Sequence, residues 1–293
     1  MSAKPPPRPQ FPRQVPPEPD NPPEWAARLE QSIARWGLKR VRRIQVLEEV
    51  GSTQDAAREL AEGGPGLVVL AARQTKGRGR LGRAWTDSRG LALSCSIVLD
   101  GRGWTDAHLS LASGAGVCRA LESLGSAMGV FCLRWPNDVV VDNWRYARPI
   151  PGELRDKPAK IAGILIERGS GLVVVGIGIN VLQQAADWPA ELARRAVSLA
   201  QLGSSASRVR VAEAVLVDLE RALDESAGSL AAAWSFRDVL VGKRAAFVHD
   251  GRRYEGTVVS IDPTSQIRVQ LVDRRVVELP ALTTSLVHDE PEC

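Results

Sequence analysis

A glycine-rich basic segment between residues 74 and 85 has the residue types that bind phosphate and carboxylate groups. It reads Gln-Thr-Lys-Gly-Arg-Gly-Arg-Leu-Gly-Arg-Ala-Trp. Glycine lets the backbone approach a ligand closely, and arginine presents a planar fork that matches phosphate and carboxylate oxygens. Such a loop can wrap an acyl-phosphate. RNA-binding arginine-glycine segments and solvated surface loops share this composition, but a position between two expected strands favours a small anionic ligand.

Residues 134–138, Arg-Trp-Pro-Asn-Asp, form a second candidate segment at the end of an apolar strand. A rigid proline turn would hold the amide of Asn137 and the carboxylate of Asp138 together. An asparagine can fix a ligand or a metal-bound water, and an aspartate can help to hold magnesium or accept a proton. An ordinary turn would use the same residues, so this segment is informative only together with the others.

Two further apolar strands carry a polar residue at one end. Lys160 opens the stretch 160–167 and could bridge a carboxylate and an α-phosphate. Asn180 ends the stretch 176–180, where it could reach a nucleotide or an ion. Considered singly, Lys160 could equally be a surface lysine with a buried stem. Asn180 could equally mark a strand that runs into a turn.

The elements that must position these segments form a mixed α/β core. Apolar residues recur at helical spacing over 24–36, 109–124 and 209–227, and a short helical piece follows at 231–236. A turn with Ser52 as the capping residue and Asp55 in the first turn begins another helix, which runs to about residue 62. Strands are expected at 41–47, 67–72, 91–99, 130–134, 139–141, 161–167 and 172–179.

The two ends of the chain differ from this core in composition. Residues 1–23 hold ten prolines, which predicts a disordered or polyproline tail. Short β segments are expected at 244–248, 254–261, 267–271 and 276–279, with a tight hairpin turn at Asp250-Gly251. We therefore expect a main domain over 24–238 and a small SH3-like β-barrel over 239–293.

Composition argues against a secreted or membrane protein. The longest apolar runs, such as residues 172–179, are far shorter than the roughly 20 residues of a membrane-spanning helix, and the N-terminus has no apolar signal segment. Four cysteines without paired spacing suggest neither disulfides nor a zinc site. We expect a cytoplasmic protein that binds neither membrane nor DNA.

Taken in order, the four segments resemble the catalytic domain of biotin protein ligases. The family pattern G-R-G-R-x-G-R is met by residues 77–83, and W-P-N-D, K-x-A-G-I-L and G-x-G-I-N follow. The resemblance extends from about Val46 through the C-terminal segment. It implies a class II synthetase-like mixed sheet followed by an SH3-like barrel, and an ATP-dependent, AMP-forming enzyme. Such an enzyme makes biotinyl-adenylate from biotin and ATP with Mg²⁺ and passes biotin to a lysine of a carboxylase's biotin carboxyl carrier domain.

The resemblance also implies roles for particular residues. The expected catalytic residues are Lys160, Arg80 and Asp138, of which Asp138 would help to remove the proton from the incoming lysine. The expected biotin-binding residues are Ser52, Thr53, Gln74, Gly77, Arg78, Arg80 and Lys160. The expected nucleotide-binding residues are Arg78, Arg80, Arg83, Trp85, Asn137, Lys160 and Asn180. No metal ligand is assigned.

Two features depart from the family pattern, and several alternatives stay open. Gln54 stands where the family usually has asparagine, and residues 142–158 form a longer, proline-bearing excursion in place of a short hairpin. A lipoate or octanoate ligase is the nearest alternative, and an RNA-binding protein is a more distant one. A DNA-binding repressor is not expected, because only about 40 residues, largely the proline-rich tail, precede the catalytic pattern. A homodimer is possible.

Overall fold

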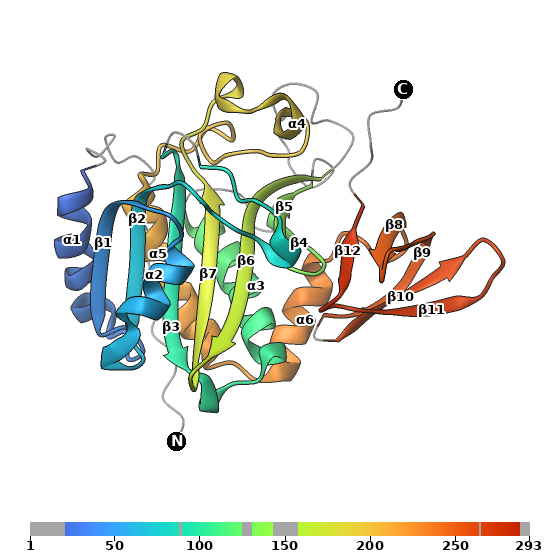
Figure 1. Ribbon diagram of the computed structural model, residues 1–293, viewed down its shortest axis with the longest axis horizontal. Coiled ribbons are helices and arrows are strands. Elements are labelled where there is room, and N and C mark those ends of the chain that lie inside the picture. Colours follow the sequence, from blue (N-terminus) through green and yellow to red (C-terminus); the bar gives the residue numbers. More distant parts are fainter. Residues whose placement is uncertain (1–20, 88–89, 125–130, 143–157, 264, 288–293) are drawn as a thin grey trace.

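The computed structural model describes residues 21–87, 90–124, 131–142, 158–263 and 265–287 of the 293-residue chain. The body of the expected proline-rich tail and nearly all of the 142–158 excursion lie outside the described residues. Within them, the chain forms one large mixed sheet with helices on both faces and a smaller antiparallel sheet near the C-terminus (Figure 1).

The large sheet has seven strands in the order β1-β2-β3-β7-β6-β5-β4. Strand β1 is parallel to β2, and every other neighbouring pair is antiparallel, so the sheet is mixed as expected. The strands are β1 (Arg43–Val50), β2 (Leu67–Gln74), β3 (Ala92–Asp100), β4 (Phe131–Arg134), β5 (Asp138–Val141), β6 (Ala159–Gly169) and β7 (Leu172–Asn180).

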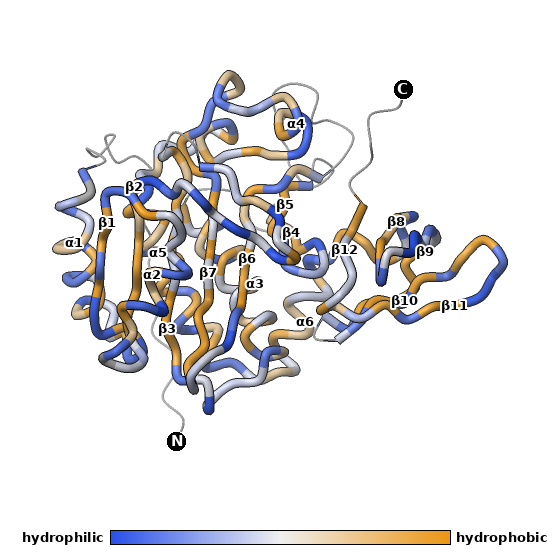
Figure 2. Tube along the Cα trace, in the orientation of Figure 1, coloured by the Kyte–Doolittle hydropathy of each residue, from blue (hydrophilic) through white to orange (hydrophobic). Residues whose placement is uncertain are grey.

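Helices bury both faces of this sheet. Helix α3 (Asp106–Ser123) packs against α5 (Arg208–Leu223) on one face, and the short α2 (Thr53–Glu59) contacts β2, β3 and β7 from the other (Figure 1). Helix α1 (Pro22–Trp36) lies beside β1. Because the central strands are covered on both sides, they are apolar almost throughout (Figure 2).

The C-terminal sheet has five antiparallel strands in the order β11-β10-β9-β8-β12. They are β8 (Arg244–His249), β9 (Arg252–Asp262), β10 (Gln266–Leu271), β11 (Val276–Pro280) and β12 (Thr284–Leu286). The expected hairpin turn is present, with φ of 47° at Asp250 and 72° at Gly251. Two consecutive positive φ angles give the turn that matches strand twist. Four strands were expected, and the three-residue β12 is an addition.

Two sequence-based boundaries were wrong. The helix expected over 209–227 ends at Leu223, and Ser226 accepts a hydrogen bond from Ser229 N to cap a separate helix, α6 (Ala227–Arg237). The tail expected to reach residue 23 ends earlier, because α1 begins at Pro22 and proline is tolerated in a first helical turn. Within the described part of the chain, no helix is both long and apolar enough to cross a membrane.

Candidate active site

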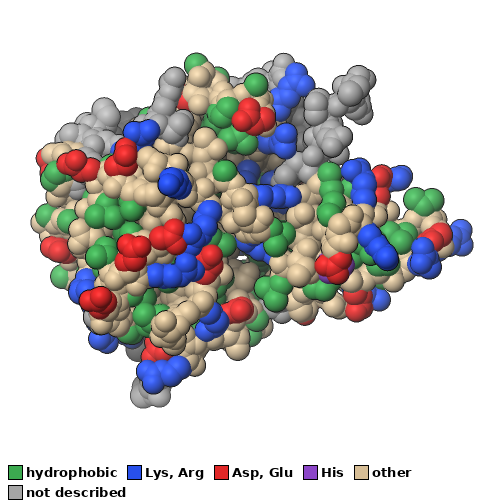
Figure 3. All heavy atoms as spheres, viewed as in Figure 1, with side chains coloured by type: hydrophobic (Ala, Val, Ile, Leu, Met, Phe, Trp, Pro, Cys, Tyr) green, Lys and Arg blue, Asp and Glu red, His purple; other side chains and the backbone are tan. Residues whose placement is uncertain are grey.

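One cavity brings all four sequence segments together. It encloses about 260 Å³ above the central strands of the large sheet. Its lining includes the ends of β2, β5, β6 and β7, the 134–138 turn, β12 of the C-terminal sheet and residues 78–86 of the glycine-rich segment, here called the arginine loop (residues 76–86). Lysine and arginine side chains gather around the hollow between the two sheets (Figure 3). The segments therefore share a single anion-attracting site.

The end of the cavity at α2 is a network of uncharged hydrogen-bonding groups. Thr53 donates to Gln74 Oε1 from its backbone N at 2.8 Å and from its Oγ1 at 3.1 Å. Ser96 Oγ lies 2.9 Å from Thr53 Oγ1 and 3.0 Å from Gln54 Oε1. Ser52 caps α2, as expected, by accepting from Gln54 N. Neutral donors and acceptors at one end suit a polar ligand head without charge.

Gln54, the departure from the family pattern, has a structural role in this network. Its Nε2 donates to the carbonyl oxygen of Val174 at 3.1 Å, and its side chain lies across Gly176. A Cβ at position 176 would stand 2.5 Å from Gln54 Oε1, so the glycine leaves room for the glutamine in this position. Gln54 was named from the sequence only as a departure from the family pattern. Ser94 and Ser96 were not named, although alternation along β3 would have placed the two serines on one face.

The arginine loop folds back on itself and connects the two sheets. Residues Arg78 and Ala84 form an antiparallel bridge, and Gly77 accepts from Trp85 N at 2.9 Å. Arg80 donates to the carbonyl oxygen of Ala281, and Arg83 donates to that of Leu286 at 3.4 Å. The loop is therefore held by the C-terminal sheet, and no sequence pattern predicts this contact.

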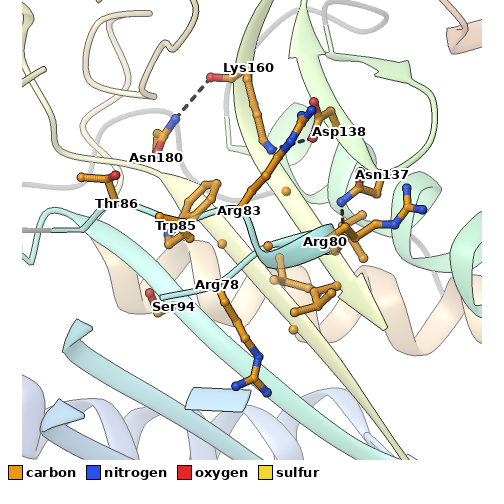
Figure 4. Close-up of a pocket in the computed structure, with 18 of the residues that line it drawn as sticks. Arg78, Arg80, Arg83, Trp85, Thr86, Ser94, Asn137, Asp138, Lys160 and Asn180 are labelled. Carbon is orange, nitrogen blue, oxygen red and sulfur yellow. Dashed lines mark hydrogen bonds and ion pairs between the residues drawn. The ribbon is translucent and has the colours of Figure 1, made fainter. Parts of the chain in front are cut away.

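The three arginines of the loop differ in their surroundings. Arg78 donates to Asp55 at 2.6 Å and to Glu167 at 3.2 Å. The hydrogen bond to Asp55 is the largest influence on Arg78 and raises its pKa despite partial burial. Burial lowers the pKa of Arg80, but a guanidinium stays protonated at neutral pH. Figure 4 shows Arg83 extending toward the Lys160–Asp138 pair, whereas Arg78 points the other way.

Trp85 covers two glycines of the sheet. A Cβ at Gly178 would lie 2.5 Å from Trp85 Cε2, and one at Gly163 would lie 3.4 Å from Trp85 Cζ3. Lys160 Nζ sits 5.6 Å from the centre of the indole ring, within range of a cation–π contact. The glycines of β6 and β7 thus give a flat aromatic ring a place against the sheet.

The opposite end of the cavity is charged. Asp138 pairs with Lys160 Nζ at 2.6 Å and with Arg134 Nη2 at 3.0 Å (Figure 4). Burial alone would raise the pKa of Asp138, but the two cations and their hydrogen bonds outweigh it and hold this pKa far below its usual range. The carboxylate is therefore ionised throughout the neutral range and keeps Lys160 in a fixed position.

The two asparagines brace the same end. Asn137 Nδ2 donates to the carbonyl oxygen of Ile164 at 2.7 Å. Asn180 Nδ2 donates at 3.2 Å to the carbonyl oxygens of Lys160 and Val197. Both side chains tie the strand that carries Lys160 to its neighbours, and both line the cavity.

Replacing Asp138 with asparagine is expected to destabilise the protein at pH 7 by about 2 kcal/mol. Breaking a fully buried pair costs roughly 3 to 5 kcal/mol, and we discount this because the Lys160 side chain is 31% exposed. Since folding lowers the pKa of Asp138, its contribution is present above the unfolded pKa near 4 and is lost as pH falls below it.

Urea unfolding of both proteins at pH 7 and pH 3 measures this effect. The stability gap between them should narrow at the lower pH, and a gap that is constant with pH would contradict the pairing. Asp273→Asn is the control, because Asp273 is exposed and also has a lowered pKa, caused by its hydrogen bond to Arg275.

Two lining segments were not expected. Trp188, Leu192, Arg195 and Ala196 approach the cavity from the stretch around α4 (Ala190–Ala193), and Thr284 to Leu286 approach it from β12. Trp188 is held by a 3.0 Å hydrogen bond from its Nε1 to Gln201 Oε1. These segments are short and weakly patterned, so only the tertiary fold brings them to the cavity.

Comparison with known proteins gives a consistent result. The model of the biotin/lipoate A/B protein ligase family matches residues 47–183. The biotin--[acetyl-CoA-carboxylase] ligase of Mycobacterium tuberculosis is 31% identical over 255 residues, which cover 80% of this chain and 86% of that protein. The bifunctional ligase/repressor BirA of Bacillus spizizenii is 32% identical over 203 residues, 66% of this chain and 58% of its own length.

A solved structure agrees with these sequence matches. The biotin protein ligase of Aquifex aeolicus in complex with biotin and ATP superimposes with a TM-score of 0.67 at 27% identity. The match covers 84% of this chain and 99% of that chain. The resemblance that the four motifs indicate is therefore confirmed, and the chain belongs to the biotin protein ligase family.

Proposed function

We propose that the chain is an ATP-dependent biotin protein ligase. The observation that carries this proposal is the polarity of one cavity, with neutral hydrogen-bonding groups at Thr53 and Gln74 and a fixed cation, Lys160, at the far end. Biotin has the same polarity, because a neutral ureido head and a carboxylate stand at its two ends. The related enzyme from Mycobacterium tuberculosis is named for this activity.

In the first step, a biotin carboxylate oxygen attacks the α-phosphorus of ATP, the bond to the bridging oxygen breaks, and pyrophosphate leaves. Two anions must approach each other, so fixed positive charge lowers the barrier. Lys160 would hold the carboxylate and an α-phosphate oxygen, and Arg80 and Arg83 would extend the positive field from the loop. A closed arginine loop would also keep water from the mixed anhydride.

Nucleotide-dependent ligation implies magnesium, which enters here as part of the ATP substrate. The protein groups do not fit a resident metal ion. Among the described residues, no cluster of three histidine, cysteine or carboxylate side chains could hold one, and both oxygens of Asp138 already face cations. We therefore assign magnesium to the phosphates and route no step through a protein-bound ion.

In the second step, a neutral lysine amine of the acceptor attacks the biotinyl carbonyl carbon, and the bond to the AMP oxygen breaks. The amine must lose a proton, for which Asp138 is the candidate from sequence. Its depressed pKa makes it a weak base, so the geometry favours a role in positioning Lys160. Asn137, Asn180 and Trp85 would then shape the nucleotide side of the cavity.

The fold supports further parts of the proposal. We place the boundary between a catalytic domain and an SH3-like barrel domain near residue 239, because the second sheet begins at Arg244. The acceptor would be the biotin carboxyl carrier domain of a carboxylase, and neither DNA nor membrane is a proposed partner. Cys95, Cys118 and Cys132 are buried thiols outside any disulfide, which fits a reducing cytoplasm.

One assay tests the proposal against its nearest alternative, a lipoate or octanoate ligase. Purified protein is mixed with biotin, ATP, magnesium and a biotin carboxyl carrier domain, and the acceptor mass is measured with lipoate and octanoate as competitors. We expect the mass to increase by one biotinyl group, with no effect of either competitor. Transfer of lipoate or octanoate in place of biotin would reject the proposed substrate.

A further inference from the structure

We propose that Ser94 Oγ donates a hydrogen bond to the thioether sulfur of bound biotin and thereby helps to select biotin over analogues without sulfur. The inference rests on the proposed function and concerns the same cavity. It assigns a specificity role to a residue outside the four sequence motifs.

Ser94 is a buried polar group with an unused hydroxyl. The residue is 2% exposed, lies in β3 and lines the cavity. Its Oγ has no hydrogen-bond partner among the residues that the structure describes. An unpartnered buried hydroxyl costs stability, and because Ser94 also lines the cavity, a bound ligand can supply the missing partner.

Its position along the cavity identifies the part of the ligand that it meets. Ser94 and Ser96 share one face of β3 and are separated by about 6.6 Å, the rise of two strand residues. Ser96 joins the neutral network at Thr53, whereas Ala92, two residues in the other direction, pairs with Asn180 beside Lys160. Along β3, Ser94 therefore stands between the groups for the ligand's head and those for its carboxylate.

The cross-strand neighbours of Ser94 are small residues. Its partners across the two adjacent strands are Ala71 on β2 and Gly178 on β7. Directly opposed residues on antiparallel strands point to the same side of the sheet, so only small groups flank the hydroxyl. The Trp85 indole, whose Nε1 is also buried and unpartnered among the described residues, lies over Gly178. Ser94 thus lines the cavity beside an aromatic wall.

Biotin offers only one polar atom at this level. Between the ureido group and the carboxylate, its skeleton is hydrocarbon apart from the ring sulfur. A thioether sulfur is an acceptor with no proton to donate, and a serine hydroxyl can rotate to supply one. Lipoate and octanoate have no equivalent sulfur beside a ureido ring, so the same contact would favour biotin over them.

The test compares Ser94→Ala with the unmodified protein on two substrates, biotin and desthiobiotin, which keeps the ureido group and the carboxylate but lacks sulfur. We expect the ratio of kcat/KM for biotin to kcat/KM for desthiobiotin, measured as adenylate formation, to fall about fivefold in the variant. The loss should occur almost entirely with biotin. Without ligand, the variant should unfold at an equal or higher temperature, because an unsatisfied hydroxyl is removed.

Ser113→Ala is the matched control. Ser113 is fully buried in α3, its hydroxyl is likewise unpartnered among the described residues, and it does not line the cavity. Its substrate ratio should stay unchanged. A conservative second variant, Ser94→Cys, carries a weaker donor and should fall between serine and alanine.

The outcomes separate this inference from the proposed function. If the unmodified protein activates biotin but Ser94→Ala lowers both substrates equally or neither, the sulfur contact is rejected and the ligase function stands. If the unmodified protein activates neither biotin nor desthiobiotin, the proposed function itself fails.

Discussion

The Lys160→Ala variant should form biotinyl-adenylate at least about a hundredfold more slowly than the unmodified protein. Removing one preorganised group that stabilises transition-state charge typically costs 10²- to 10³-fold in rate. Here the loss should be near the upper figure, because Asp138 fixes Lys160 at 2.6 Å before the ligand binds. No reorganisation is then needed when the carboxylate meets the α-phosphate.

Pyrophosphate release in the presence of biotin and ATP measures this effect directly. Lys243→Ala is the control, since Lys243 is an exposed lysine next to the C-terminal sheet and does not line the cavity. Lys160→Arg should recover little activity, because a broad guanidinium does not replace a compact ammonium at a fixed point. A normal rate of adenylate formation in Lys160→Ala would show that this lysine is not catalytic.

The architecture was largely predictable because it depends on local patterns. Buried strands such as β3 and β7 are continuous apolar runs, and α3 has an apolar face along its length. The wrong helix boundary occurred where the pattern of residue types does not change clearly along the chain. The junction of α5 and α6, Asp224 to Ser226, contains neither glycine nor proline, and only the capping hydrogen bond at Ser226 marks the new helix.

Which residues lie at the site could be predicted from the motifs. What each side chain contacts there was less predictable. Lys160, Asp138 and Asn180 do lie together, as their motifs indicated. Arg78 matches the motif equally well, yet its guanidinium is paired with Asp55 and Glu167. Those partners are 23 and 89 positions away along the chain, and no spacing rule connects residues at such separations.

Contributions from other elements to the cavity were beyond sequence reasoning. Ser94 is an ordinary serine in an apolar strand, and the hydroxyl becomes informative only when burial and the missing partner are known. The contact of Arg80 with Ala281 depends on how the C-terminal sheet sits against the large one. Such packing is set by the whole fold.

The Arg80–Ala281 hydrogen bond leads to a second prediction with a large expected effect, for the Arg80→Gly variant. The variant should release biotinyl-adenylate and label lysines of unrelated proteins about tenfold or more above the unmodified protein. Arg80 lines the cavity, where it would carry a charge toward the proposed adenylate, and it ties the arginine loop to the C-terminal sheet. Without either function, the loop should open more often and let a reactive anhydride meet solvent.

Labelling of a bystander protein such as serum albumin, compared with the carrier domain, gives the selectivity. Arg80→Ala distinguishes the two possible causes, because alanine removes the guanidinium without the backbone freedom that glycine adds. If both variants leak, the lost guanidinium is responsible. If only the glycine variant leaks, the cause is loop flexibility. Unchanged acceptor selectivity in both variants would show that Arg80 does not help to close the loop. Retention of the intermediate would then have to come from groups outside the loop, such as Lys160 on β6 and Asn180 on β7.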